Sequence, residues 1–187
     1  ASNGIGLELF NLFKDNFKKK LICSYNHNEI KLKKKNIIIK KIDIEKDLDV
    51  IFSTIKKYKP SIVYYFPTPK INLNANTNKQ LKVYKKFYTT IPIKIIKFCI
   101  LHKSFFFYPS STFIDKGDSN YYTLFKKHAE NQIFQIKFNK VYVNILRIPE
   151  INTKQNLTIF DKNLPSFTKL ININKNFKEK IFFKNLI

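Results

Sequence analysis

Apolar residues along this chain gather in short runs that alternate with longer stretches of helical spacing. The short runs, which predict buried strands, span residues 20–25, 37–44, 61–66, 104–109 and 140–147. The stretches with helical spacing, which predict helices, span residues 5–17, 46–57, 77–88, 93–101 and 120–133. This alternation predicts an α/β fold of three layers, in which βαβ units build a doubly wound parallel sheet between helices. After Pro149 the chain is polar and irregular.

Length and cysteine content limit the class of protein further. A chain of 187 residues predicts one domain with a short appendage. The sequence has no run of about 18 apolar residues, so we expect no membrane partner, and no charged-then-apolar leader opens it. Cys23 and Cys99 are too few for a disulfide framework or a zinc site. We therefore expect a cytoplasmic protein without a metal site.

The formal net charge of +22 raises nucleic acid as a partner. The abundant residue types, which are Lys, Asn, Ile and Phe, share A/T-rich codons, however, while Ala and Gly occur three times each. A compositional bias of the genome explains this profile without selection for binding. The lysines are scattered, and no pattern of a known nucleic-acid-binding module accompanies them. We therefore expect solvated lysines and no nucleic-acid partner, with a basic binding module as an alternative that rests on charge alone.

Two of the three glycines stand directly before or within the start of the first predicted helix. Glycine tolerates positive φ and lets backbone N–H groups approach a phosphate, and a helix N-terminus adds partial positive charge. The opening segment therefore predicts a turn that binds a pyrophosphate, with a plain helix cap as the alternative. The residues of this turn are Ser2, Asn3, Gly4, Ile5 and Gly6.

A tyrosine and a lysine four residues apart, Tyr122 and Lys126, stand in the last predicted helix, and Glu130 follows one turn later. Residues at this spacing share one helix face, and a neighbouring ammonium would lower the pKa of the tyrosine toward a range useful for acid–base chemistry. Ser110 and Ser111 follow the fourth predicted strand, at the sheet edge where open α/β folds bind ligands. These residues could hold a substrate oxygen and exchange a proton with it, whereas an ordinary exposed helix is the alternative.

Both segments resemble the short-chain dehydrogenase/reductase family. The opening turn is similar to the family's Gly-Ala-Ser-x-Gly-Ile-Gly turn, and Tyr-x-x-x-Lys-x-x-x-Glu after a serine-bearing strand is similar to the epimerases and dehydratases of nucleotide-linked sugars. Matching Phe113-Ile114 to the Val-Tyr pair of that branch makes Ser110 the catalytic serine, with Ser111 as the alternative. Asp43, after the second predicted strand, matches the family's acidic residue near the adenine ring.

This resemblance covers about residues 1–150 and implies a Rossmann fold. It implies an NAD(P)-binding catalytic domain over 1–150, and a C-terminal extension or the start of a substrate-binding region over 151–187. The activity implied is hydride transfer to or from a carbonyl or carbinol carbon, with Ser110, Tyr122 and Lys126 as catalytic residues. The residues implied to bind the cofactor are Ser2, Asn3, Gly4, Ile5, Gly6, Asp43, Tyr122 and Lys126. The family's first strand would precede Ala1, so we expect a longer polypeptide.

The sequence departs from the family at two places. Phe66-Pro67-Thr68-Pro69 stands where the family has Asn-Ala-Gly or an equivalent. No carboxylate follows the first predicted strand, near Cys23 to His27, which favours NADP over NAD. The altered segment 66–69 favours the alternative function, a non-catalytic Rossmann domain that binds a nucleotide as a sensor or scaffold. The substrate is expected to be a small molecule, and a homodimer stays open.

Overall fold

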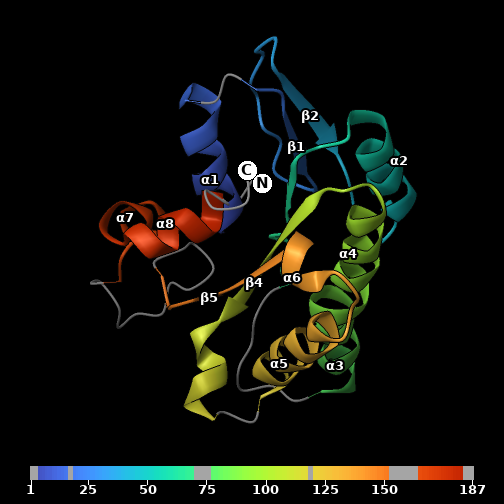
Figure 1. Ribbon diagram of the computed structural model, residues 1–187, viewed down its shortest axis with the longest axis vertical. Helices are drawn as coiled ribbons and strands as arrows, with labels where there is room; N and C mark the ends of the chain where they lie inside the picture. The colour runs from blue at the N-terminus through green and yellow to red at the C-terminus, as the bar shows by residue number, and fades with distance from the viewer. Residues whose placement is uncertain (1–3, 17–18, 70–76, 118–119, 152–163, 183–187) are drawn as a thin grey trace. The chain divides into compact units, whose positions relative to one another are not determined.

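The computed structural model describes residues 4–16, 19–69, 77–117, 120–151 and 164–182 (Figure 1). The chain divides into two compact units. The first unit comprises Ala1–Asp47 and Ile151–Ile187, and the second comprises Leu48–Glu150. Each is considered by itself.

The described residues of the first unit form a two-stranded parallel sheet and three helices. Strand β1 (Leu21–Tyr25) pairs with β2 (Ile37–Lys41), with Cys23 opposite Ile39. Helix α1 (Gly4–Asn16) packs Phe10 against Cys23 and Ile37 of the two strands. This unit therefore has its own apolar cluster under α1.

The polar composition of the chain after Pro149 predicted an irregular segment, but the described part of this segment is helical. It forms α7 (Phe167–Ile173) and α8 (Lys175–Phe182), which bury Phe167, Ile171, Phe177 and Ile181. The Glu8 carboxylate of α1 accepts hydrogen bonds from the backbone N–H and the hydroxyl of Thr168, at 3.0 and 3.1 Å. A carboxylate at the first turn of a helix also meets the positive end of its dipole. These contacts explain why a segment of weak helical pattern is helical.

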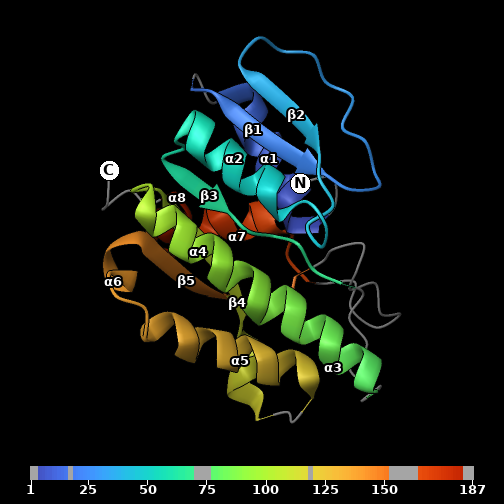
Figure 2. The ribbon, with the colours of Figure 1, turned by 90° about the vertical axis from the view of Figure 1, so that its right-hand side faces the viewer.

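The second unit is built on a three-stranded parallel sheet of order β3-β4-β5. The strands are β3 (Ile62–Tyr64), β4 (Phe105–Ser111) and β5 (Val143–Ile148). The helices are α2 (Leu48–Tyr58), α3 (Asn78–Tyr84), α4 (Ile91–Leu101), α5 (Tyr121–Phe134) and α6 (Asn139–Tyr142), with a 3-10 turn η2 (Thr112–Lys116) after β4. Helices α4 and α5 both pack on β4, which lies at the centre of the unit (Figure 2).

Parallel strands flanked by helices confirm the α/β prediction. The strand β4 is longer than predicted, because Ser110 and Ser111 pair with Arg147 and Ile148 of β5 and so belong to the strand. Among the described residues, no helix has both the length and the apolar character needed to cross a bilayer.

The two helices predicted over 77–88 and 93–101 are one continuous element. A π-helical turn, η1 (Lys85–Thr90), joins α3 to α4, and Pro92 follows it inside the first turn of α4. Proline has no N–H, so the carbonyl of Tyr88 has no ordinary helical donor four residues later. The N–H of Ile91 donates to the Lys86 carbonyl, five residues back, which leaves the Phe87 carbonyl without its own helical donor.

Two buried tyrosines supply the missing donors. The hydroxyl of Tyr65 donates to the Phe87 carbonyl at 2.7 Å, and that of Tyr108 donates to the Tyr88 carbonyl at 2.8 Å. Buried carbonyls require such partners, because leaving one unpaired costs about 1–3 kcal/mol. The π-turn is therefore anchored to β4 and to the residue that follows β3.

The substitution Tyr65→Phe tests this anchoring. It removes the donor to Phe87 while keeping the ring, and it should lower the free energy of unfolding by about 1–2 kcal/mol, measured by urea denaturation. Tyr142→Phe is the matched control, since that half-buried ring stacks on Phe105 at 5.7 Å and should change stability by less than about 0.5 kcal/mol. Equal stability of the two variants would contradict the anchoring.

Candidate active site

The sequence-predicted catalytic residues of the second unit lie at the carboxyl end of β4 and on the first half of α5. Asn120 begins α5, since its side-chain oxygen accepts the N–H of Thr123 at 3.0 Å. Tyr122 and Lys126 follow on one face of this helix, as predicted. The structure therefore brings the end of β4 and the tyrosine–lysine face of α5 together.

Tyr122 is directed toward Ser111 and not toward Ser110. The Ser111 hydroxyl lies close enough to that of Tyr122 to favour the phenolate, and it also accepts the N–H of Phe113 at 3.2 Å. Successive side chains of a strand point to opposite faces, so Ser110 cannot make the same contact. Its hydroxyl is buried and has no hydrogen-bond partner among the described residues. The alternative serine of the sequence analysis is thus the one that contacts Tyr122.

Burial raises the pKa of Tyr122, and the hydrogen bond from Ser111 opposes that rise. The lowered pKa that we expected from Lys126 is therefore wrong. Desolvation penalises the phenolate, and the Lys126 amine lies over the Tyr122 ring, 5.9 Å from its centre. Tyr122 keeps its proton at neutral pH and suits the role of a proton donor.

Lys126 is 6% exposed, and its amine lies among aromatic rings. Its Nζ donates to the Pro109 carbonyl at 2.5 Å. It also lies 4.6 Å from the centre of the Tyr88 ring and 5.0 Å from that of Tyr108. Burial lowers the pKa of Lys126 to about 7, with Glu130 opposing that change. Burial therefore brings the loss of this proton from the alkaline range toward neutral pH.

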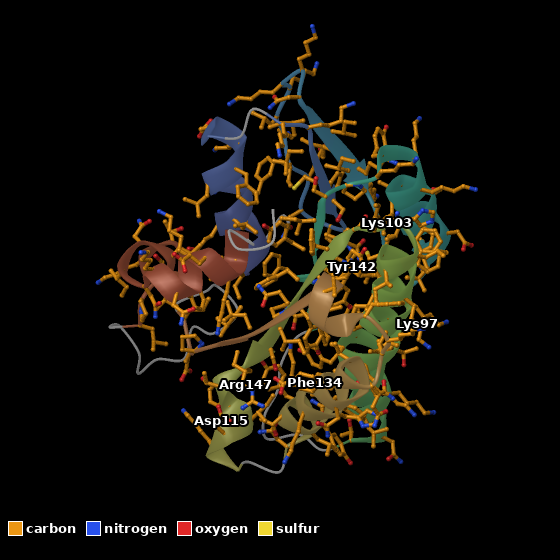
Figure 3. The ribbon with its side chains drawn as sticks, viewed as in Figure 1. Lys97, Lys103, Asp115, Phe134, Tyr142 and Arg147 are labelled. Atoms are coloured by element: carbon orange, nitrogen blue, oxygen red, sulfur yellow. The ribbon has the colours of Figure 1, made fainter. Side chains whose placement is uncertain are left out.

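An ion-pair network lies one turn beyond Lys126 on α5. The Arg147 guanidinium donates to both oxygens of the buried Glu130 carboxylate, from Nε at 3.1 Å and from Nη2 at 2.6 Å. Its Nη1 donates to Asp115 of η2 at 2.5 Å, and Figure 3 labels this pair. A two-pronged contact of this kind fixes orientation as well as charge. Arg147 therefore ties β5 to α5 and to the turn after β4.

The predicted phosphate turn belongs to the first unit. Ser2 and Asn3 lie outside the described residues, whereas Gly4 begins α1 with φ of 51°. That left-handed conformation favours glycine, as a phosphate turn requires. Ile5 is half-buried and Gly6 buried within the same helix. The structure therefore supplies one of the backbone features that the motif needs.

Asp43 closes a turn after β2. Its carboxylate accepts the N–H of Glu45 at 3.0 Å, and one of its oxygens lies 4.0 Å from the Lys46 amine. Its own N–H donates to Asp47 at 2.7 Å. Asp43 thus stabilises this turn, in addition to the contact with adenine that the resemblance implies.

Sequence reasoning missed the aromatic surroundings of Lys126. Tyr88 is far along the sequence from every predicted site residue. Tyr108 was predicted only as part of a strand. The interval between Tyr122 and Lys126 was readable because it is local, whereas the rings come from η1 and β4. Among the described residues, no group of His, Cys, Asp and Glu could hold a metal ion.

Comparisons with known proteins place the fold. No family model and no curated protein matches the sequence. The chain is similar to a hypothetical dTDP-4-dehydrorhamnose reductase from Sulfolobus tokodaii, with a TM-score of 0.63 and 21% identity over 81% of this chain and 54% of that one. It is also similar to a short chain dehydrogenase from Burkholderia cenocepacia in complex with NADP, with a TM-score of 0.70 and 10% identity over 88% of this chain and 76% of that one.

A third similar structure is UDP-glucose 4-epimerase with UDP-glucose from Thermotoga maritima, with a TM-score of 0.61 and 12% identity over 78% of this chain and 52% of that one. The chain thus spans about half the length of the reductase and the epimerase. These similarities establish the fold class: the chain has the α/β Rossmann-type fold that short-chain dehydrogenases and nucleotide-sugar epimerases share. The predicted fold is confirmed.

The depressed pKa of Lys126 predicts a pH dependence of stability. The folded chain releases this proton near pH 7, whereas the unfolded chain holds it until its ordinary pKa of 10.5. Between these values the unfolded state binds more protons, so stability should rise with pH, by up to about 1.4 kcal/mol per pH unit.

Urea denaturation between pH 6.5 and 9.5 measures this contribution. Lys126→Met should lack the rise, so that its stability curve diverges from that of the parent protein as the pH increases. Lys127→Met, which removes the exposed neighbouring amine, should run parallel to the parent. A Lys126→Met curve that also runs parallel would contradict the burial of a titrating amine.

Proposed function

We propose that the chain is the nucleotide-binding catalytic part of an NAD(P)-dependent oxidoreductase of the short-chain dehydrogenase/reductase type. The observation that carries the proposal is the position of Tyr122 at the carboxyl end of β4, beside the Ser111 hydroxyl and with its ring centre 5.9 Å from the Lys126 amine. In open α/β folds this end of the strands is where ligands bind. The fold and the three side chains agree with one chemistry, namely proton exchange with an oxygen whose bonded carbon is reduced or oxidised.

Each of the three residues has a defined task in this proposal. Tyr122, which burial keeps protonated, donates its proton to the substrate oxygen as the carbonyl is reduced, and recovers it in the reverse direction. Ser111 orients the Tyr122 hydroxyl and contacts the same oxygen. Lys126 holds its amine beside the Tyr122 ring, where the protonated form supplies a positive charge.

A nicotinamide cofactor, when bound, supplies or accepts the hydride. The residues that would hold it are those of the opening turn, Ser2, Asn3, Gly4, Ile5 and Gly6, with Asp43 near the adenine. The positive φ of Gly4 and the helix that begins there fit a pyrophosphate. Strand β1 ends at Tyr25 and is followed by Asn26 and His27 without a carboxylate, which supports NADP over NAD.

The proposed substrate is a carbonyl or carbinol group on a small molecule, with a nucleotide-linked sugar as the first class to test. The resemblance of the Ser110–Ile114 and Tyr122–Glu130 segments to the epimerase branch supports this class. The alternative, a non-catalytic nucleotide-binding domain, is favoured by the prolines of Phe66-Pro67-Thr68-Pro69 where the family has small residues.

The substitution Tyr122→Phe separates these functions. It removes the proposed proton donor but keeps the ring, so NADPH oxidation with nucleotide-linked keto sugars should fall at least about 100-fold while NADPH binding stays within about twofold. Tyr121→Phe, on the neighbouring half-buried position of α5, should leave both unchanged. Turnover that survives in Tyr122→Phe would exclude this residue as the proton donor.

A further inference from the structure

Three tyrosine rings enclose the Lys126 amine, and each comes from a different element. Tyr88 of η1, Tyr108 of β4 and Tyr122 of α5 lie with ring centres 4.6, 5.0 and 5.9 Å from Nζ. We refer to these three residues as the tyrosine enclosure. An ammonium over an aromatic ring is attracted by the negative face of the ring, most strongly where water is excluded. The enclosure thus offers a cation the kind of surface that compensates for lost hydration.

Hydrogen bonds fix two of these rings in place. The Tyr88 hydroxyl pairs with the hydroxyl of Thr68 at 2.7 Å, and the Tyr108 hydroxyl donates to the Tyr88 carbonyl at 2.8 Å. The ring of Tyr84 packs on that of Tyr88, with centres 5.6 Å apart. Both Tyr88 and Tyr108 are almost fully buried. Neither ring can turn away from Lys126 without breaking a buried hydrogen bond.

Glu130, the nearest carboxylate on α5, is not a hydrogen-bond partner reserved for Lys126. Glu130 attracts the ammonium, but both of its oxygens already accept hydrogen bonds from Arg147 of β5. The titratable groups that face the amine are Tyr88, Tyr108, Tyr122 and Glu130. Tyr65 and Tyr84 lie behind the Tyr88 and Tyr108 rings, and Arg147 lies behind Glu130. The aromatic faces and the Pro109 carbonyl are its closest contacts.

We propose that Tyr88 and Tyr108 are positioning residues that stabilise the ammonium form of Lys126 and hold it beside Tyr122, with Thr68 fixing the ring of Tyr88. The catalytic relevance of this enclosure rests on the proposed function, but its electrostatic effect does not. It also gives the unusual segment Phe66–Pro69 a role: Thr68 holds the enclosure from outside the helices.

Carbon NMR of the full chain labelled with 13C at the lysine Cε position tests this proposal. Lys126 is identified as the signal that is lost in Lys126→Met and that titrates well below the other lysines. Tyr88→Leu, which removes one ring, should lower the Lys126 pKa by about one unit, a tenfold change in its protonation constant. Tyr88→Phe, which keeps the ring, should shift that pKa by less than half as much.

A matched control and a milder variant complete the test. Tyr142→Leu removes a ring that packs on Phe105 and takes no part in the tyrosine enclosure, and it should leave the Lys126 titration unchanged. If Tyr88→Leu does not fold, Thr68→Val releases the Tyr88 hydroxyl alone and should lower the Lys126 pKa by a few tenths of a unit. A Lys126 pKa that stays the same or rises in the variant that folds would overturn the proposal.

The NMR titration needs no turnover, so its outcome is separate from that of the proposed function. An unchanged Lys126 pKa in a protein whose activity depends on Tyr122 would remove the enclosure but keep the oxidoreductase. A lowered Lys126 pKa in a protein that turns over no substrate would support the enclosure and contradict the catalytic proposal.

Discussion

The second unit depends on the burial of one amine, that of Lys126. Taking an ammonium out of water costs several kcal/mol unless new partners compensate, and Lys126 is only 6% exposed. Its partners come from β4, η1 and α5: the Pro109 carbonyl, the Tyr108 and Tyr88 rings, and the face of Tyr122. Because the compensation is spread over three elements, their packing and the charge of Lys126 constrain each other.

The π-turn η1 carries Tyr88, one of the rings that contact the Lys126 amine. Pro92 leaves the Tyr88 carbonyl without a helical donor, and the π-turn, in which the N–H of Ile91 donates to Lys86, leaves the Phe87 carbonyl without one as well. The hydroxyls of Tyr65 and Tyr108 donate hydrogen bonds to these two carbonyls. Tyr108 serves twice, since the same side chain holds the Tyr88 carbonyl and presents its ring to Lys126. The same tyrosine side chain therefore stabilises the π-turn and positions Lys126.

The sequence predicted what depends on neighbours along the chain. The β-branched and aromatic runs around Ile38, Val63 and Phe106 marked strands that are indeed parallel, and the four-residue interval from Tyr122 to Lys126 placed both on one face of α5. What failed depended on distant residues or on burial. The sequence favoured Ser110 over Ser111, whereas Ser111 lies beside Tyr122, because both serines belong to β4 and point to opposite faces of the sheet. The pKa of Tyr122 was expected in the wrong direction, because burial outweighs a neighbouring cation.

The central claim, a nicotinamide site on a Rossmann-type fold, is tested most directly by titrating the protein with NADPH and NADH at two salt concentrations, followed by reduced-nicotinamide fluorescence. The account predicts saturable binding, tighter for NADPH, that changes little between the two salt concentrations. Absence of binding would contradict it. So would binding that falls steeply and log-linearly with salt, because that behaviour belongs to a polyanion held by scattered lysines.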